Sequence, residues 1–192
     1  MRAAALAAAA LLLVQAAGAA APGLPWWSPL GVRDLSGGPL RPGGRWTVVV
    51  ALGIECPVSN ASIPELNRIA ADFAGGGVVL VGACVDPDAT LAQLRSHAAE
   101  FGIRFTLADD RLQRLALASG LSYTPEVAVF AADGRRLYLG SVDDRVGAGG
   151  AQKPSATRHF LREVLQSLAS GGKGPFEDHP GYGCTLAEPV KP

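Results

Sequence analysis

Cysteine is scarce in this sequence, and neither sign of charge is in excess. Three cysteines in 192 residues are too few for a fold held together by disulfides, and their odd number leaves one outside any internal pair. Lys plus Arg and Asp plus Glu both number 17, so there is no basic excess with which to bind nucleic acid. A phosphate-binding glycine loop, zinc-ligand spacing and a Ser-His-Asp order are also missing. We therefore expect no cofactor, no bound metal and no nucleic-acid partner.

Long apolar runs are missing too, except at the N-terminus. Arg2 precedes an unbroken apolar run over 3–14, and small residues follow through Ala21. This layout predicts a signal peptide over 1–21, cleaved after a small-x-small site. An uncleaved anchor is the alternative, but about 19 residues rich in alanine barely span a bilayer. We therefore expect a secreted or periplasmic protein that has no membrane span after cleavage.

Segments typical of strands and of amphipathic helices alternate along the rest of the chain. Apolar β-branched runs or strict alternation predict strands, and apolar residues three to four apart predict helices. The predicted strands are 46–54, 78–85, 103–107, 126–131 and 137–142. The first predicted helix runs from Pro57 to the glycines at 75–77, and Pro64 should kink it. The second is capped by Asp88, the third covers 110–119, and the fourth is capped by Thr157.

The order of these segments predicts an α/β fold. Strands that alternate with helices form a mostly parallel central sheet with helices on both faces. The Asp133-Gly134 turn predicts a closing β-hairpin, which adds antiparallel strands and makes the sheet mixed, and a C-terminal helix follows. We divide the chain into a signal peptide (1–21), a Pro- and Gly-rich N-terminal extension with at most a short hairpin (22–45), one domain (46–170) and a C-terminal tail (171–192).

Cys56 has the sequence context of a reactive thiol. It follows a predicted strand and precedes a predicted helix whose first turn holds Pro57. Sites in open α/β sheets form at the carboxyl ends of strands, and a helix start offers unpaired N–H groups and the positive end of its dipole. Both favour the thiolate, so we expect the pKa of Cys56 to be lowered. The alternative is an inert cysteine in the core.

Four segments resemble the thioredoxin-like superfamily, and most of all its redoxin branch. That branch includes the alkyl hydroperoxide reductase and thiol-specific antioxidant proteins and secreted thiol-disulfide oxidoreductases. The segments are VVVALGIECPVSN at 48–60, the proline at 64, YTPEVAVF at 123–130 and DGRRLYLGSVDD at 133–144. The resemblance extends over about 30–170 and implies a thioredoxin-like fold.

The resemblance also implies roles for individual residues. Cys56 would be the nucleophile, and Pro125 would be a cis proline that faces it and shapes the substrate groove. The backbone of Thr124 would pair with an extended substrate. The other groove residues would be Pro57, Ser59 and Asn60. The substrates would be protein or small-molecule disulfides or peroxides, and a thiol reductant would restore the cysteine.

Two positions depart from the patterns of these families. Thioredoxins carry a second cysteine three residues after the first, where this chain has Ser59. Peroxiredoxins carry Thr or Ser three residues before the peroxidatic cysteine, where this chain has Gly53. The first departure leaves no local thiol to resolve an oxidised Cys56. The second removes the hydroxyl that would position a peroxide, which favours disulfide exchange over peroxide reduction.

A cysteine distant in the sequence, or one of another molecule, would therefore have to react with an oxidised Cys56. Cys184 lies in a Gly-rich tail that can reach back over the site, and we expect it to be the partner, either as a resolving thiol or in a structural bridge. Cys84 ends the second predicted strand at the same edge of the sheet and is a second candidate. An intermolecular disulfide is the main rival.

Two further functions stay open at this point. Related copper chaperones bind the metal with two cysteines four residues apart, but here Asn60 occupies the second position. Copper would then need Cys184 or a histidine such as His179. Alternatively, Cys56 and Cys184 are permanently bridged and the groove binds a protein partner without catalysis.

Overall fold

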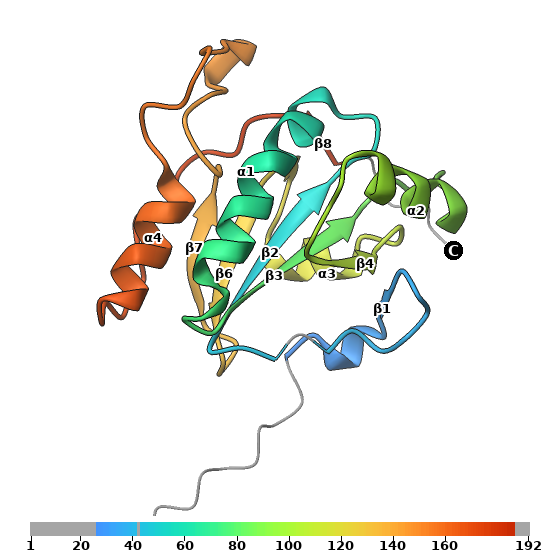
Figure 1. The fold of residues 1–192 in the computed structure, drawn as a ribbon, viewed down its shortest axis with the longest axis horizontal. Coiled ribbons are helices and arrows are strands. Elements are labelled where there is room, and N and C mark those ends of the chain that lie inside the picture. The colour runs from blue at the N-terminus through green and yellow to red at the C-terminus, as the bar shows by residue number, and fades with distance from the viewer. Residues whose placement is uncertain (1–25, 42, 187–192) are drawn as a thin grey trace, which may run out of the picture.

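The computed structural model of the chain describes residues 26–41 and 43–186, so the predicted signal peptide lies outside the described residues. Its centre is a six-stranded sheet in the order β1-β4-β3-β2-β6-β7 (Figure 1). The strands are β1 (Arg33–Asp34), β2 (Trp46–Leu52), β3 (Val78–Cys84), β4 (Thr106–Asp109), β6 (Val127–Ala131) and β7 (Arg136–Gly140). The β2–β3 and β3–β4 pairings are parallel, and the other three are antiparallel. The mixed α/β sheet is confirmed, although fewer of its pairings are parallel than expected.

Helices cover both faces of this sheet. They are α1 (Pro57–Ala74), α2 (Leu91–Glu100), α3 (Arg114–Ser119) and α4 (Phe160–Ala169). Figure 1 shows α1, α2 and α4 on one side and α3 on the other. Val48 and Val50 of β2 belong to the core cluster under α1, α2 and α4, whereas Val49 and Ala51 belong to the cluster on the α3 side. All residues of β2 are buried, as its continuous apolar run predicted.

No helix of the described residues is both long enough and apolar enough to cross a membrane.

The register of β2 brings two distant sequence motifs together. β2 pairs antiparallel with β6, and Val50 lies opposite Val127. The segment after β2 contains Cys56, and the segment before β6 contains Pro125. Both segments therefore meet at the end of the sheet where β2 and β3 finish, which is where sites form in open α/β sheets.

The N-terminal extension contributes more than a short hairpin. Its strand β1 pairs with β4 and so belongs to the central sheet. Trp27 is buried in the cluster on the α3 side and donates its Nε1–H to the carbonyl of Leu40 at 3.4 Å. Trp26 packs against Phe130, with ring centroids 4.5 Å apart. Burial of large aromatic rings binds this segment to the domain.

Two predicted helix caps are wrong. Thr90, not Asp88, caps α2, because its hydroxyl accepts a hydrogen bond from the N–H of Gln93 while the Gln93 side chain accepts one from the N–H of Thr90. The expected cap of α4, Thr157, lies in the preceding loop, and α4 begins three residues later. There the N–H of Thr157 donates to the carboxylate of Asp144 at 2.7 Å, so a tertiary contact holds it outside the helix.

Asp110 is likewise outside the helix that it was expected to begin. Its buried carboxylate accepts hydrogen bonds from the N–H groups of Leu115 (2.9 Å) and Ala116 (2.8 Å), and it thereby caps α3 from the loop. Burial raises the pKa of Asp110 to about 6, although these hydrogen bonds act in the opposite direction.

The raised pKa predicts a stability that depends on pH. The folded chain holds the Asp110 proton up to about pH 6, whereas the unfolded chain releases it near 3.8, so the contribution of this group to stability falls as pH rises between these values. We expect the free energy of unfolding of the wild type, relative to Asp110→Asn, to decrease by roughly 2 kcal/mol from about pH 4 to about pH 7. Urea unfolding at each pH measures it. Asp133→Asn in an exposed turn is the control, and a difference that does not vary with pH contradicts the prediction.

Candidate active site

Cys56 lies at the start of α1, just beyond the carboxyl end of β2. Its backbone is extended (φ −83°, ψ 111°), and its Sγ accepts a hydrogen bond from the N–H of Ser59 at 3.4 Å. Cys56 is therefore the N-cap of α1, a position that oxygen-bearing side chains usually fill. Pro57 takes the first helical position, where no N–H is needed. The N–H group and the helix dipole both stabilise negative charge on this sulfur.

A disulfide joins Cys56 to Cys184, and their Cα atoms are 6.1 Å apart. This is the pairing that we expected from the sequence. Cys56 is only 5% exposed, whereas Cys184 is an exposed residue. Cys84, at the end of β3, is free and buried, and burial raises the pKa of its thiol to about 12. Almost no thiolate forms on Cys84 near neutral pH, so it is a poor candidate for resolving Cys56.

The segment before β6 lies against the sulfur of Cys56. The Thr124–Pro125 peptide bond is cis, as the family resemblance implied, and both residues are buried. The Sγ of Cys56 is 3.2 Å from the carbonyl oxygen of Thr124. Glu126, also buried, accepts a hydrogen bond from the N–H of Ser122 at 2.6 Å and so closes the turn that carries the cis proline. Burial raises the pKa of Glu126.

The C-terminal tail reaches the site as a strand. β8 (Cys184–Thr185) pairs antiparallel with β5 (Tyr123–Thr124), and Cys184 lies opposite Thr124. Figure 1 shows β8 beside the N-terminal end of α1. This pairing could not be predicted from the sequence, because strands of two residues leave no hydrophobic period.

Two half-buried side chains, Asp86 and Asn60, hold the loop between β2 and α1. The N–H of Ile54 donates to the carboxylate of Asp86 at 2.8 Å, and the amide of Asn60 donates to the carbonyl of Ile54 at 2.9 Å. The Oδ1 of Asn60 lies 2.8 Å from the Nε2 of His97 on α2. Burial raises the pKa of Asp86 and lowers that of His97. Asn60 thus positions the loop instead of lining the groove. We did not assign Asp86 or His97 a role from sequence, although Asp86 follows a strand that ends at the site.

Ser59 is also a support, not a groove residue. It is fully buried, and its Oγ accepts a hydrogen bond from the N–H of Gly53 at 3.3 Å. A Cβ on Gly53 would lie 3.3 Å from both the Cβ of Cys56 and the Oγ1 of Thr124. The position that carries a hydroxyl in peroxiredoxins is therefore crowded by Thr124 in this chain.

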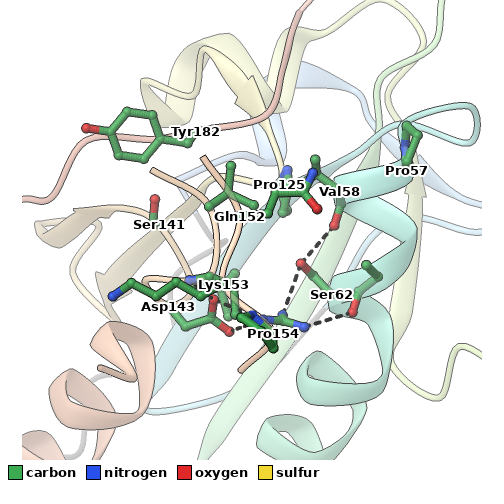
Figure 2. Close-up of a pocket in the computed structure, with 14 residues that line it drawn as sticks. Pro57, Val58, Ser62, Pro125, Ser141, Asp143, Gln152, Lys153, Pro154 and Tyr182 are labelled. Carbon is green, nitrogen blue, oxygen red and sulfur yellow. Dashed lines mark hydrogen bonds and ion pairs between the residues drawn. The ribbon is translucent and has the colours of Figure 1, made fainter. Parts of the chain in front are cut away.

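Two hollows flank the disulfide. The larger, of about 400 Å³, lies between the first turns of α1, Pro125 and the loop that follows β7 (Figure 2). Its wall includes Pro57, Ala61, Asp143 and Arg145. Arg145 forms an ion pair with Asp143 at 2.8 Å and donates a hydrogen bond to the carbonyl of Ala61 at 3.2 Å. The smaller, of about 250 Å³, is lined by Cys56, Cys184 and Thr124. Of the expected groove residues, Pro57, Thr124 and Pro125 thus face a hollow.

The described part of the chain (26–41 and 43–186) gathers no group of three His, Cys, Asp or Glu side chains that could hold a metal ion. His179, which we considered as a copper ligand, is stacked on Phe160 of α4 with ring centroids 3.9 Å apart. The copper alternative therefore gains no structural support from this histidine.

A model of the Redoxin family matches residues 36–157, well over half of the chain. Among solved structures, an uncharacterised conserved protein of Geobacillus kaustophilus is 24% identical, with a TM-score of 0.72 over 84% of this chain and 89% of its own. A secreted Mycobacterium tuberculosis disulfide oxidoreductase homologous to E. coli DsbE is 22% identical, with a TM-score of 0.51 over 71% of this chain and 94% of its own.

The bacterioferritin comigratory protein of Xanthomonas campestris, described for alkyl peroxide reduction, is 16% identical, with a TM-score of 0.55 over 76% of this chain and 96% of its own. No match was found among curated proteins. These comparisons confirm the thioredoxin-like fold and the resemblance to its redoxin branch.

Proposed function

This chain belongs to the Redoxin family, and on that premise we propose that it is an extracytoplasmic thiol–disulfide oxidoreductase with Cys56 as nucleophile and Cys184 as redox partner. The observation that carries the proposal is the disulfide between the cysteine that caps α1 and an exposed cysteine, beside a cis proline. Redox-active cysteines sit where the surroundings stabilise a thiolate, and the cap position does so for Cys56.

The cycle opens with reduction by a dithiol. A thiolate of the reductant attacks the sulfur of Cys184, because that residue is exposed and Cys56 is not. The disulfide breaks, Cys56 leaves as a thiolate, and Cys184 is bonded to the reductant. The second thiol of the reductant then displaces Cys184, which takes up a proton. Two electrons have passed to the protein, and the reductant leaves as a disulfide.

The second half of the cycle reduces a substrate. The thiolate of Cys56 attacks a substrate disulfide, a mixed disulfide forms, and the first substrate sulfur leaves as a thiol after protonation. Cys184 then attacks the sulfur of Cys56, which restores the internal disulfide and releases the second substrate thiol. The substrate gains the two electrons that the protein loses. The reverse direction oxidises a dithiol substrate by the same steps.

Disulfides suit this site better than peroxides. Gly53 offers no hydroxyl at the position where peroxiredoxins place one, and Thr124 crowds the space next to it. The Mycobacterium tuberculosis protein is a secreted disulfide oxidoreductase, and a bridge of this kind persists in an oxidising compartment. Together with the expected signal peptide over 1–21, this supports a secreted or periplasmic location.

Thiol mapping by mass spectrometry tests the proposal on the mature chain. We expect dithiothreitol to open the Cys56–Cys184 bridge while the fold persists, and oxidised glutathione to close it again faster than one equivalent of hydrogen peroxide does. Cys84 should stay unmodified throughout, because it is buried as a thiol. A bridge that opens only when the chain unfolds would contradict catalysis and favour the non-catalytic binding module.

A further inference from the structure

A short segment of the tail lies along the edge of β5. We call residues 181–186, Gly-Tyr-Gly-Cys-Thr-Leu, the tail segment. It runs antiparallel to β5, with Cys184 opposite Thr124. The N–H of Leu186 donates to the carbonyl of Ser122 at 3.0 Å, and the hydroxyl of Thr124 donates to the carbonyl of Cys184 at 3.4 Å. This is the backbone edge beside the nucleophile at which an extended substrate would pair.

The part of the tail before this segment is attached to the fold independently of the disulfide. The N–H of Phe176 donates to the carbonyl of Leu137 at 2.7 Å, and the N–H of His179 donates to that of Leu139 at 3.1 Å. The hydroxyl of Ser141 donates to the carbonyl of Pro180 at 2.6 Å. These bonds tie the tail to β7 and the residue after it, and they stop where the tail segment begins.

The tail segment itself has few attachments. Gly183, Cys184 and Thr185 are exposed, and β5–β8 is a pairing of two residues on each side. A two-stranded pairing of this size is marginal in water unless something tethers it. The disulfide is a covalent tether that holds Cys184 beside Cys56 and so restrains this short pairing.

We propose that the tail segment is an internal substitute for the substrate of the proposed reaction. In the oxidised chain it covers Cys56 and occupies the edge of β5. After reduction it leaves, and an extended polypeptide that carries a disulfide-bonded cysteine takes its place. The inference rests on the proposed function, and it adds that access to Cys56 is controlled by the redox state of the chain's own tail.

The tail segment also indicates which polypeptides fit. Gly183 has φ +157°, and a Cβ there would collide with the carbonyl of Thr124. Leu186, two residues after the cysteine, is half-buried and packs on the core cluster under α3. The favoured partner therefore has glycine immediately before its cysteine and an apolar residue two positions after it.

Hydrogen exchange on the mature chain tests the release of the tail segment. On reduction with dithiothreitol we expect amide exchange at 182–186 to accelerate by about a hundredfold, because the tether is lost. Exchange at 137–141 and 176–179 should change little, since those bonds do not depend on the disulfide. If 182–186 keep their protection after reduction, the proposal is overturned.

A peptide experiment tests the fit. The probe is the hexapeptide Gly-Tyr-Gly-Cys-Thr-Leu, blocked at both ends and carried as its disulfide with glutathione, added to reduced Cys184→Ser chain. The matched peptide has valine in place of the second glycine. We expect Cys56 to form its disulfide with the first peptide about tenfold faster. Equal rates overturn the inference and leave the proposed function standing, whereas no reaction with either peptide overturns both.

Discussion

Cys56→Ser abolishes thiol–disulfide exchange, whereas Cys184→Ser stops the reaction halfway. Serine at 56 removes the sulfur that caps α1, so no mixed disulfide forms and the rate falls by more than about a hundredfold. Serine at 184 leaves that sulfur in place but removes the thiol that would attack the mixed disulfide. The intermediate between Cys56 and the substrate should therefore accumulate in this variant.

Two measurements together separate these outcomes. Reduction of a fluorescent disulfide substrate gives the rate, and mass spectrometry under acid quench detects the mixed disulfide. Cys84→Ala is the matched control, because Cys84 is the remaining cysteine and its thiol has a pKa of about 12. It should retain the wild-type rate. Full activity in Cys184→Ser would show that another thiol completes the cycle, and a mixed disulfide in Cys56→Ser would assign the nucleophile elsewhere.

The nucleophile and its setting could be predicted because their signals are local. The run at 46–54 is a nearly continuous apolar segment, and all of β2 is buried. Cys56 and Pro57 follow it after the single residue Glu55, which marks a helix start, and α1 begins at Pro57. The proline of the Thr124-Pro125 pair stands directly before a strand, and its cis bond matches the family pattern.

The residues that support the nucleophile could not be predicted, because their partners are far apart in the sequence. Asp86 binds Ile54 and His97 binds Asn60 through contacts that exist only after β2, β3 and α2 are packed together. The same holds for β1, which pairs with a strand more than 70 residues away, and for β8. Edge strands of two residues have too little sequence to show a period of two. Ser59 and Asn60 were placed in the groove from motif position alone, and the direction of each side chain decided otherwise.

Reduction of the Cys56–Cys184 bridge should lower the free energy of unfolding by about 3 kcal/mol. The two cysteines are 128 residues apart, and the chain-entropy model assigns a loop of this length an upper value near 5 kcal/mol. Two features reduce the net effect. The tail stays attached to β7 without the disulfide, and the start of α1 stabilises the thiolate of the reduced chain. For a chain of this size, the melting temperature should fall by roughly 10 °C.

The size of this change also separates catalysis from a structural bridge. A disulfide that stabilises the fold is itself stabilised by the fold to the same extent, and about 3 kcal/mol corresponds to a reduction potential roughly 60 mV lower than in the unfolded chain. A dithiol reductant can still open such a bridge.

Urea unfolding of the oxidised chain, the reduced chain and the Cys56→Ser, Cys184→Ser double variant measures the difference, with Cys84→Ala as control. A loss well above 5 kcal/mol would make the bridge too stable to cycle, and no loss at all would mean that the bridge does not restrain the tail.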